Sequence, residues 1–177
     1  AINKPSDNVF SRTLLLALGR ATPGAPAEPT LLRADRAVRG WLRSKGLNDD
    51  GLVLDNGSGL SRSERISPAL LEGVVRAGLA SRWAPEFLAS LPIAGVDGTL
   101  RNRLTASPAA GTARLKTGTL RNVVALAGTM TDAGGQPLVV VAVINHDALR
   151  PRQMRPLLDG LIDWVARTRF VPVPAGN

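Results

Sequence analysis

In the first half of the chain, apolar residues recur every three to four positions, which is the period of amphipathic helices. Helix-capping residues stand before these runs: Ser6-Asp7-Asn8 precedes the first, and Ser67-Pro68 opens another, with proline at the first helical position. Gly19 marks the expected end of the first helix. The expected helices are about Val9 to Leu18, Leu31 to Ser44, Ser67 to Gly78, Pro85 to Ser90 and Thr99 to Leu104.

In the second half, the pattern changes to apolar runs typical of strands, and the turn sequence Asp132-Ala133-Gly134-Gly135 joins the last two. The expected strands are Ala113 to Thr119, Val123 to Thr131 and Leu138 to Asn145, with a short candidate earlier at Leu52 to Leu54. A closing amphipathic helix is expected over about Gln153 to Arg167. Its apolar face would contain Met154, Leu157, Leu161, Ile162 and Val165.

Helices, then an antiparallel meander, then a closing helix form an α+β order. The chain has 177 residues, 44% of them hydrophobic, which suits one soluble globular domain or one piece of a domain. No apolar run approaches the roughly 20 residues that span a bilayer, so no transmembrane segment is expected. The chain starts with alanine and shows no signal-peptide pattern. We therefore expect it to begin inside, or after processing of, a longer product.

The composition limits the kinds of functional site that the chain can contain. The chain has no cysteine, which excludes disulfides and thiolate metal sites. His146 is the only histidine, and its place at the end of an expected strand favours a structural or solvent-facing role over catalysis. The formal net charge of +8 favours anionic partners, but no tyrosine and only three phenylalanines argue against a nucleic-acid stacking surface. Arginines at positions 33, 36, 39 and 43 are interpreted as a solvated helix face.

Two short motifs stand at junctions of the expected fold. Lys116-Thr117-Gly118-Thr119 lies on the first strand of the meander, and Ser6-Asp7-Asn8 lies where a loop enters a helix. Alone, the first is an ordinary strand end and the second an ordinary helix cap. Their order and placement together match the motif set of serine β-lactamases and penicillin-binding proteins, in which a Ser-x-x-Lys motif comes first.

Such a motif set performs acyl transfer with lysine in place of histidine. A desolvated lysine has a lowered pKa and can activate a neighbouring serine, and a second serine can relay a proton to the leaving amine. A lysine on a strand supplies positive potential, threonine hydroxyls bind a substrate carboxylate, and glycine lets the substrate backbone approach closely. A strand N–H can complete an oxyanion hole.

Two further segments make the chain resemble a known family. Residues 55–62, Asp-Asn-Gly-Ser-Gly-Leu-Ser-Arg, with Ser67-Pro68, and residues 91–100, Leu-Pro-Ile-Ala-Gly-Val-Asp-Gly-Thr-Leu, are similar to class C low-molecular-mass penicillin-binding proteins. These are D-alanyl-D-alanine carboxypeptidase/endopeptidases. The resemblance runs from Asn3 to the C-terminal helix. It implies a β-lactamase/transpeptidase-like fold, an antiparallel sheet flanked by helices, with residues 1–177 as the C-terminal portion of a single domain.

The resemblance also implies catalytic roles for matching residues. Ser6 would relay protons, Asn8 would orient the acylating lysine and bind the substrate amide, and Lys116 would set the electrostatic field of the site. Two other polar groups of the similar segments, Asp55 and Asp97-Gly98-Thr99, are interpreted more simply. The first would tie its loop through an Asx turn, and the second would cap a helix and form a turn.

Substrate contacts are implied in the same way. Thr117 and Thr119 would receive the terminal carboxylate, and the Thr119 N–H would form half of the oxyanion hole. Gly118 would allow close approach of the substrate backbone. Leu60 and Arg62 would form the rim of the substrate pocket, although loop packing and a surface charge explain these two residues about equally well.

The chain departs from the family pattern in one respect, because it contains no Ser-x-x-Lys motif. The lysines are Lys4, Lys45 and Lys116, and the residues three positions before them are Ala1, Leu42 and Ala113. Family members carry that motif near their N-terminus, so we expect the nucleophile and its lysine in an upstream segment. That segment would also supply two of five strands, leaving three here with an unpaired edge and an exposed apolar surface. We expect a separate chain, or self-association, to cover them.

These inferences predict a serine-type D-Ala-D-Ala carboxypeptidase, with or without endopeptidase activity, that acts on peptidoglycan stem peptides and is acylated by β-lactams. This chain alone is expected to be inactive. No metal and no organic cofactor are implied, and the expected location is the periplasm. The alternatives are a catalytically inactive penicillin-binding-like scaffold or binding domain, and a serine β-lactamase. A nucleic-acid-binding module comes last because only the charge favours it.

Overall fold

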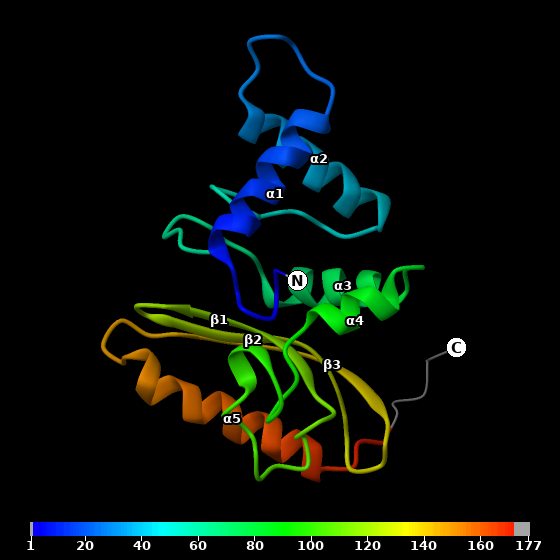
Figure 1. The fold of residues 1–177 in the computed structure, drawn as a ribbon, viewed down its shortest axis with the longest axis vertical. Helices are drawn as coiled ribbons and strands as arrows, with labels where there is room; N and C mark the ends of the chain where they lie inside the picture. The colour runs from blue at the N-terminus through cyan, green and yellow to red at the C-terminus, as the bar shows by residue number, and fades with distance from the viewer. Residues whose placement is uncertain (1, 172–177) are drawn as a thin grey trace. The chain divides into compact units, whose positions relative to one another are not determined.

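The structure, a computed structural model, describes residues 2–171 (Figure 1). It divides into two compact units, Ala1–Ser90 and Leu91–Asn177, called unit 1 and unit 2 below. Ala1 and residues 172–177, which the single-domain prediction also covers, lie outside the described residues. That the whole chain forms one portion of a single domain stays a prediction.

Unit 1 consists of helices and loops, as the spacing of its apolar residues predicts. The caps are confirmed: Asp7 Oδ1 accepts the Phe10 N–H at 2.9 Å, and Ser67 Oγ accepts the Leu70 N–H at 3.1 Å. These oxygens satisfy N–H groups that a first helical turn leaves without intrahelical partners. The helices are α1 (Asn8–Ala21), α2 (Thr30–Ser44), α3 (Pro68–Leu79) and α4 (Ala84–Ser90).

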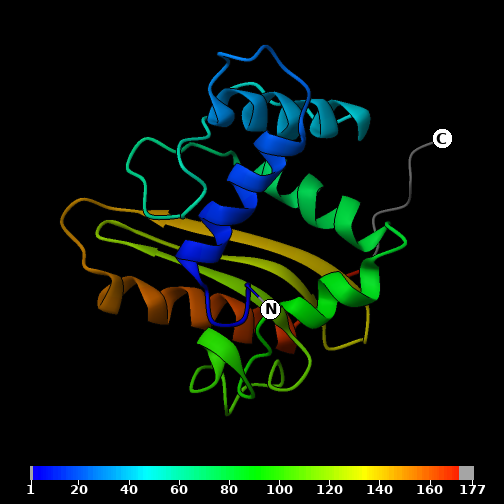
Figure 2. The same cartoon turned by 45° about the horizontal axis from the view of Figure 1, so that its top comes forward.

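The prediction that Gly19 ends the first helix is wrong. α1 continues to Ala21, and Gly19 is buried within it. A methyl group at Gly19 would collide with the carbonyl oxygen and the side chain of Thr30, at the start of α2. The glycine is therefore required for the close approach of the two helices, which lie side by side in Figures 1 and 2. Sequence alone does not distinguish a packing glycine from a terminating one.

The core of unit 1 is small. Leu42, Leu52 and Leu70 are buried together, and Val38, Leu47, Leu54 and Val74 pack against them partly exposed. The strand expected at Leu52 to Leu54 is not formed, since only an isolated antiparallel bridge joins Val53 to Arg65. This bridge closes the base of the loop between the two residues, because each N–H donates to the other residue's carbonyl, at 2.9 and 3.0 Å.

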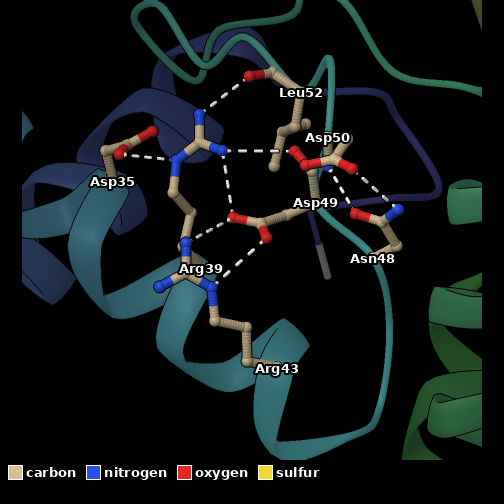
Figure 3. A network of polar contacts seen from close by, with 7 residues as sticks. All are labelled: Asp35, Arg39, Arg43, Asn48, Asp49, Asp50 and Leu52. Atoms are coloured by element: carbon tan, nitrogen blue, oxygen red, sulfur yellow. Dashed lines mark hydrogen bonds and ion pairs between the residues drawn. The ribbon is translucent and has the colours of Figure 1, made fainter.

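An arginine of α2 anchors the segment that leads into this loop (Figure 3). Arg39 Nε donates to Asp35 at 2.8 Å, Nη1 donates to the Asp49 carboxylate at 3.1 Å, and Nη2 donates to the Leu52 carbonyl at 2.7 Å. Arg43 also pairs with Asp49, at 3.1 Å. The predicted solvated face therefore holds for the exposed Arg36 and Arg43. It is wrong for Arg33, which is partly buried, and for Arg39, which is three-quarters buried in this polar clasp.

Unit 2 is a three-stranded antiparallel meander covered on one face by a helix. The strands are β1 (Arg114–Leu120), β2 (Val123–Thr131) and β3 (Pro137–Asn145), in the order β1-β2-β3, and the helix is α5 (Pro151–Arg167). Figures 1 and 2 both show α5 running along one face of the sheet. The predicted turn is confirmed, because the Asp132 carboxylate accepts the N–H groups of Gly134 and Gln136. The helix expected at Thr99 to Leu104 is only a 3₁₀ turn, η1 (Gly98–Leu100).

A continuous apolar core joins the sheet of unit 2 to α5. Leu115, Leu126 and Met154 are fully buried within it. The predicted apolar face of the helix is partly wrong, since Leu157 is 59% exposed and Leu161 is 37% exposed. The buried residues of α5 are Met154, Leu158, Ile162, Val165 and Ala166. The buried stripe is therefore rotated from the expected one, because the sheet packs against positions that spacing alone ranks equally with their neighbours.

The α+β order with a three-stranded antiparallel sheet is confirmed. Among residues 2–171, no helix combines the length and the apolar character that crossing a bilayer requires.

Candidate active site

The Lys-Thr-Gly-Thr motif lies on β1, which is an edge strand of the sheet in the described residues. Side chains of a strand alternate between faces, so Thr117 and Thr119 share the face of the buried Leu115, and Lys116 points to the opposite face. Thr117 pairs with Leu126 across the ladder, and that leucine belongs to the core beneath α5. The two threonines are therefore held at the sheet's border by a buried neighbouring strand.

The backbone of β1 also has a defined direction. The Leu115 N–H donates to the Pro92 carbonyl at 2.9 Å, on the side of β1 away from β2. Backbone groups of alternate residues point to the same side of a strand. The N–H groups of Thr117 and Thr119 therefore point toward this outer edge. This geometry suits a backbone donor to a substrate carbonyl, as an oxyanion hole requires.

Lys116 is half-buried, and burial lowers the pKa of its ammonium group, because desolvation disfavours the charged form. Its Nζ donates to the Thr117 carbonyl at 2.7 Å, which fixes the charge near the outer edge of β1. A positive charge that is partly removed from water attracts an anion more strongly than one on an exposed side chain.

Two residues that the sequence pattern did not assign to the site form hydrogen bonds with the threonine hydroxyls. Thr99 Oγ1 in η1 lies 2.8 Å from Thr117 Oγ1, so the two hydroxyls share a hydrogen bond. Arg155 Nη2 in α5 donates to Thr119 Oγ1 at 3.4 Å. Thr99 belongs to a segment that the resemblance identified, for which helix capping and turn formation are the simpler interpretation. The turn exists as well, because Asp97 Oδ1 accepts the Ile93 N–H.

In unit 1, the Ser-x-Asn motif forms the entry to α1. Ser6 has φ of +57°, a left-handed conformation that costs a non-glycine residue on the order of 1–3 kcal/mol. Local contacts hold it, since the Ser6 N–H donates to the Asn3 carbonyl, and Asn3 Nδ2 donates to Ser90 Oγ at 2.9 Å. Such strain is concentrated at functional sites. Asn8 is the first residue of the helix.

The glycine-serine loop between Val53 and Arg65 packs against the beginning of α1. A methyl group built at Gly57 would lie 2.8 Å from the Leu15 side chain, and one at Gly59 would lie 3.9 Å from Asn8 Oδ1. Both glycines have positive φ, +71° and +77°. The loop therefore follows the surface of α1 closely because it lacks side chains where it passes the helix.

Side chains within the loop maintain its shape. Asn56 Oδ1 accepts the Ser58 N–H at 2.9 Å, so the Asx turn expected of Asp55 is made by the next residue. The buried Ser61 accepts the N–H groups of Ser63 and Glu64. The two predicted pocket-rim residues on this loop, Leu60 and Arg62, are exposed to solvent, and Leu60 is 60% exposed.

The structure thus groups the predicted site residues into two sets. Unit 1 brings Asn8 next to the loop that carries Leu60 and Arg62, with Ser6 two residues before Asn8. Unit 2 carries the set Lys116, Thr117, Gly118 and Thr119.

His146 has the structural role that its position predicts. Its Nδ1 accepts the backbone N–H groups of Ala148 and Leu149, at 3.2 and 3.1 Å, in the turn between β3 and α5. A ring nitrogen that accepts two backbone hydrogen bonds stabilises the turn. The lysine-based motif is therefore the candidate for acyl transfer among the described residues.

Comparisons with known proteins agree with these motifs. Residues 1–165 match the D-Ala-D-Ala carboxypeptidase 3 (S13) family. The chain is 32% identical over 149 residues to a D-alanyl-D-alanine carboxypeptidase from Actinomadura sp., covering 81% of this chain and 27% of the relative. It is 33% identical over 144 residues to D-alanyl-D-alanine carboxypeptidase DacB from Haemophilus influenzae, covering 80% and 30%. The chain therefore spans about a third of the length of the curated relatives it matches.

Solved structures share the fold. Penicillin binding protein 4 from Haemophilus influenzae, complexed with a β-lactam, superposes with a TM-score of 0.82 at 28% identity, over 94% of this chain and 40% of that chain. A predatory endopeptidase from Bdellovibrio bacteriovorus superposes with a TM-score of 0.69 at 19% identity, over 93% and 41%, and shows likeness of fold alone. From the match over residues 1–165, the chain belongs to the D-Ala-D-Ala carboxypeptidase 3 (S13) family.

Proposed function

We propose that this chain is the C-terminal part of a serine-type D-Ala-D-Ala carboxypeptidase that acts on peptidoglycan stem peptides and is acylated by β-lactams. The observation that carries the proposal is the arrangement of β1. A partly desolvated lysine, two threonine hydroxyls and outward-pointing backbone N–H groups lie together on one edge strand. These groups are what a peptide with a terminal carboxylate and a reacting carbonyl requires.

In this proposal, unit 2 binds the end of the substrate. Thr117 and Thr119 donate hydrogen bonds to the terminal carboxylate, and Lys116 contributes positive potential. The outward N–H of Thr119 stabilises the oxyanion that develops on the reacting carbonyl, and Gly118 lets the substrate backbone approach. Binding at the strand edge orients the peptide, which lowers the entropic part of the activation barrier.

Unit 1 supplies groups for proton transfer and for the rim of the pocket. Ser6, held in a strained left-handed conformation, relays a proton to the leaving amine, and Asn8 orients the acylating lysine and the substrate amide. Gly59 of the loop lies next to the Asn8 side chain, which supports the proposal that the loop and the Ser-x-Asn motif act in the same site. Leu60 and Arg62, exposed on that loop, contact the peptide stem.

The nucleophile belongs to a Ser-x-x-Lys motif that this chain does not contain. In the proposed reaction, the serine oxygen attacks the carbonyl of the penultimate D-alanine, and the bond to the terminal D-alanine breaks as its nitrogen receives a proton. Water then hydrolyses the acyl-serine ester. A β-lactam acylates the same serine through its ring amide. If the leaving amine comes from a cross-linked stem, the same steps constitute endopeptidase activity.

Exposed apolar residues support an additional polypeptide or a second copy of the chain as partner. On α1, Val9 is 75% exposed, Phe10 62% and Leu14 61%, which form an apolar helix surface in contact with water. β3 is an edge strand of the sheet in the described residues. We propose that the segment carrying the nucleophile, or self-association, covers these surfaces, and that the complete protein works on the cell wall in the periplasm.

Covalent labelling tests the proposal. The 177-residue chain, alone and extended by the sequence encoded upstream of it, is incubated with a fluorescent penicillin, and intact masses are measured. We expect no adduct on the chain alone and one penicillin adduct on the extended protein. The chain's three lysines allow a matched pair in the extended protein: Lys116→Ala should be labelled far more slowly than wild type, whereas Lys45→Ala, at an exposed position after α2, should be labelled at the wild-type rate.

An extended protein that stays unlabelled would contradict the proposal. It would favour a catalytically inactive binding or scaffold domain, the alternative that the missing Ser-x-x-Lys motif supports. An adduct that forms and disappears within seconds would instead favour a serine β-lactamase, because such enzymes deacylate quickly. Size-exclusion chromatography tests the proposed partner, and a stable monomer of the 177-residue chain would argue against it.

A further inference from the structure

Arg155 contacts Thr119, one of the two proposed carboxylate-binding threonines, from a distant part of the sequence. It lies in the first half of α5, and its guanidinium Nη2 donates to Thr119 Oγ1 at 3.4 Å, although 36 positions separate the two residues. The exposed arginine thus reaches the border of the sheet at the motif strand. An amphipathic helix pattern alone gives such a residue no role beyond solubility.

The charge of Arg155 is not neutralised within the described residues. The acidic residues of α5 are Asp159 and Asp163. Asp159 stands four positions after Arg155, a spacing at which helix ion pairs form, but it pairs with Arg103 at 2.6 Å. Asp163 pairs with Arg167 at 2.8 Å. The positive charge beside Thr119 is therefore available to an external anion.

The contact also decides which way the Thr119 hydroxyl can donate. A hydroxyl has one proton and two acceptor sites. Because Thr119 Oγ1 accepts from Arg155, its own proton is left to donate to another group. Thr117 Oγ1 lies 2.8 Å from Thr99 Oγ1, where either hydroxyl can donate, so Thr117 keeps its own proton for an anion when Thr99 is the donor. The two hydroxyls lie on the same face of β1, so with Thr99 as donor to Thr117 both can donate to one anion.

We propose that Arg155 is a specificity-determining residue for the terminal carboxylate of the substrate. It orients the Thr119 hydroxyl as a donor and adds an uncompensated positive charge to the carboxylate site. Guanidinium and hydroxyl groups together favour a carboxylate over a neutral amide, because charge-assisted hydrogen bonds are about twice as strong as neutral ones. This inference rests on the proposed carboxypeptidase function.

The test compares two substrates of the protein that includes the upstream sequence. One is a stem peptide ending in D-Ala-D-Ala, and the other is the same peptide with a C-terminal amide. For Arg155→Ala, we expect kcat/KM for the acid to fall about ten- to a hundred-fold, mainly through KM, as the loss of a hydrogen bond to a charged group implies. The amide should react at the wild-type rate, and Arg155→Lys should partly restore the preference.

Arg167→Ala is the matched control. It removes the same charge from the same helix, twelve positions or about 18 Å away along α5, and should leave the ratio of the two substrates unchanged. The amide substrate is an internal control for folding, since a misfolded variant would lose both reactions equally.

The outcomes separate the inference from the proposed function. If the wild-type protein neither cleaves the acid nor reacts with penicillin, the proposed function fails, and the role of Arg155 fails with it. If the wild-type protein is active but Arg155→Ala keeps its preference for the acid, or loses both substrates in parallel, Arg155 does not determine specificity and the function stands.

Discussion

The two units hold their parts of the proposed site by different means. In unit 2, the motif strand borders a core of fully buried side chains such as Leu115, Leu126 and Ile162, which joins the sheet to α5. In unit 1, only Leu42, Leu52 and Leu70 form a buried cluster among the described residues. There the shape of the loop depends on polar contacts, above all the Arg39 clasp and the hydrogen bonds of Ser61.

This difference matches the chemistry proposed for each unit. Anion and oxyanion binding require donors with fixed geometry, and a strand packed on a core provides that rigidity. A pocket rim that accepts varied peptide stems suits a loop held by a few polar contacts. Unit 1 also exposes apolar residues on α1, among them Val9 and Phe10.

Truncation of a core leucine should have the largest effect on stability. The size of that effect should differ between the two units. Leu126→Ala in unit 2 should lower the free energy of unfolding by about 2–5 kcal/mol, and Leu42→Ala in unit 1 by less, because the small core of unit 1 relaxes more easily. Urea unfolding is followed by fluorescence of Trp164 for unit 2 and of Trp41 for unit 1, each in a background with the other tryptophans replaced by phenylalanine. Equal losses would contradict the contrast.

Removal of the motif lysine, Lys116, should have the next largest effect. In the extended protein, Lys116→Ala should slow penicillin acylation about a hundredfold or more, since it removes a preorganised charge from the site. Leu60→Ala, on the loop of unit 1, should change the rate only a few-fold. Stopped-flow or gel-based acylation rates measure both. If the leucine variant were the slower one, the catalytic importance would lie with the loop.

Disruption of the clasp should affect unit 1 alone. Arg39→Gln should destabilise the unfolding step reported by Trp41 more than Arg43→Gln does, because the Arg39 side chain is 25% exposed and that of Arg43 is 68% exposed. The Trp164 step should not change. A shift of the Trp164 step would show that the clasp supports the whole chain and not only the loop.

Changes of pH should have the smallest effects, at acidic pH for Asp49 and at alkaline pH for Lys116. The Arg43 and Arg39 guanidinium groups lower the pKa of Asp49 below its ordinary 3.8, so the stability that this carboxylate contributes is present above pH 3.8 and is lost as pH falls through the lowered pKa. Asp49→Asn should remove this acid-dependent part from the Trp41 step. Acid titration of the variant beside wild type measures it.

For Lys116, burial lowers the pKa below the ordinary 10.5. The unfolded chain therefore binds more protons than the folded one between the two pKa values, so stability rises with pH in that window, whereas carboxylate binding weakens as the ammonium loses its proton. We expect penicillin acylation to decline at a lower pH than an unperturbed lysine would give. A rate that stays flat up to pH 10.5 would contradict the lowered pKa.

Much of the local structure could be predicted from the sequence, because it depends on near neighbours. The caps at Asp7 and Ser67, the turn at Asp132 and the three strands follow from local hydrogen bonding and side-chain periodicity. Predictions failed where a distant contact decided the outcome. Gly19 lies inside α1 because α2 approaches it there. The buried face of α5 is rotated because the sheet selects it.

The sequence by itself determined the motifs and their order, and with them the family, because the residue types that acyl transfer requires can be recognised without coordinates. Only the tertiary structure decided which groups support those motifs. It brought Thr99 to Thr117, Arg155 to Thr119, and Gly59 to Asn8. The physical reason is that hydrogen bonds and close packing act over a few ångströms. Which residues come that close depends on how helices and strands pack, and no local pattern encodes it.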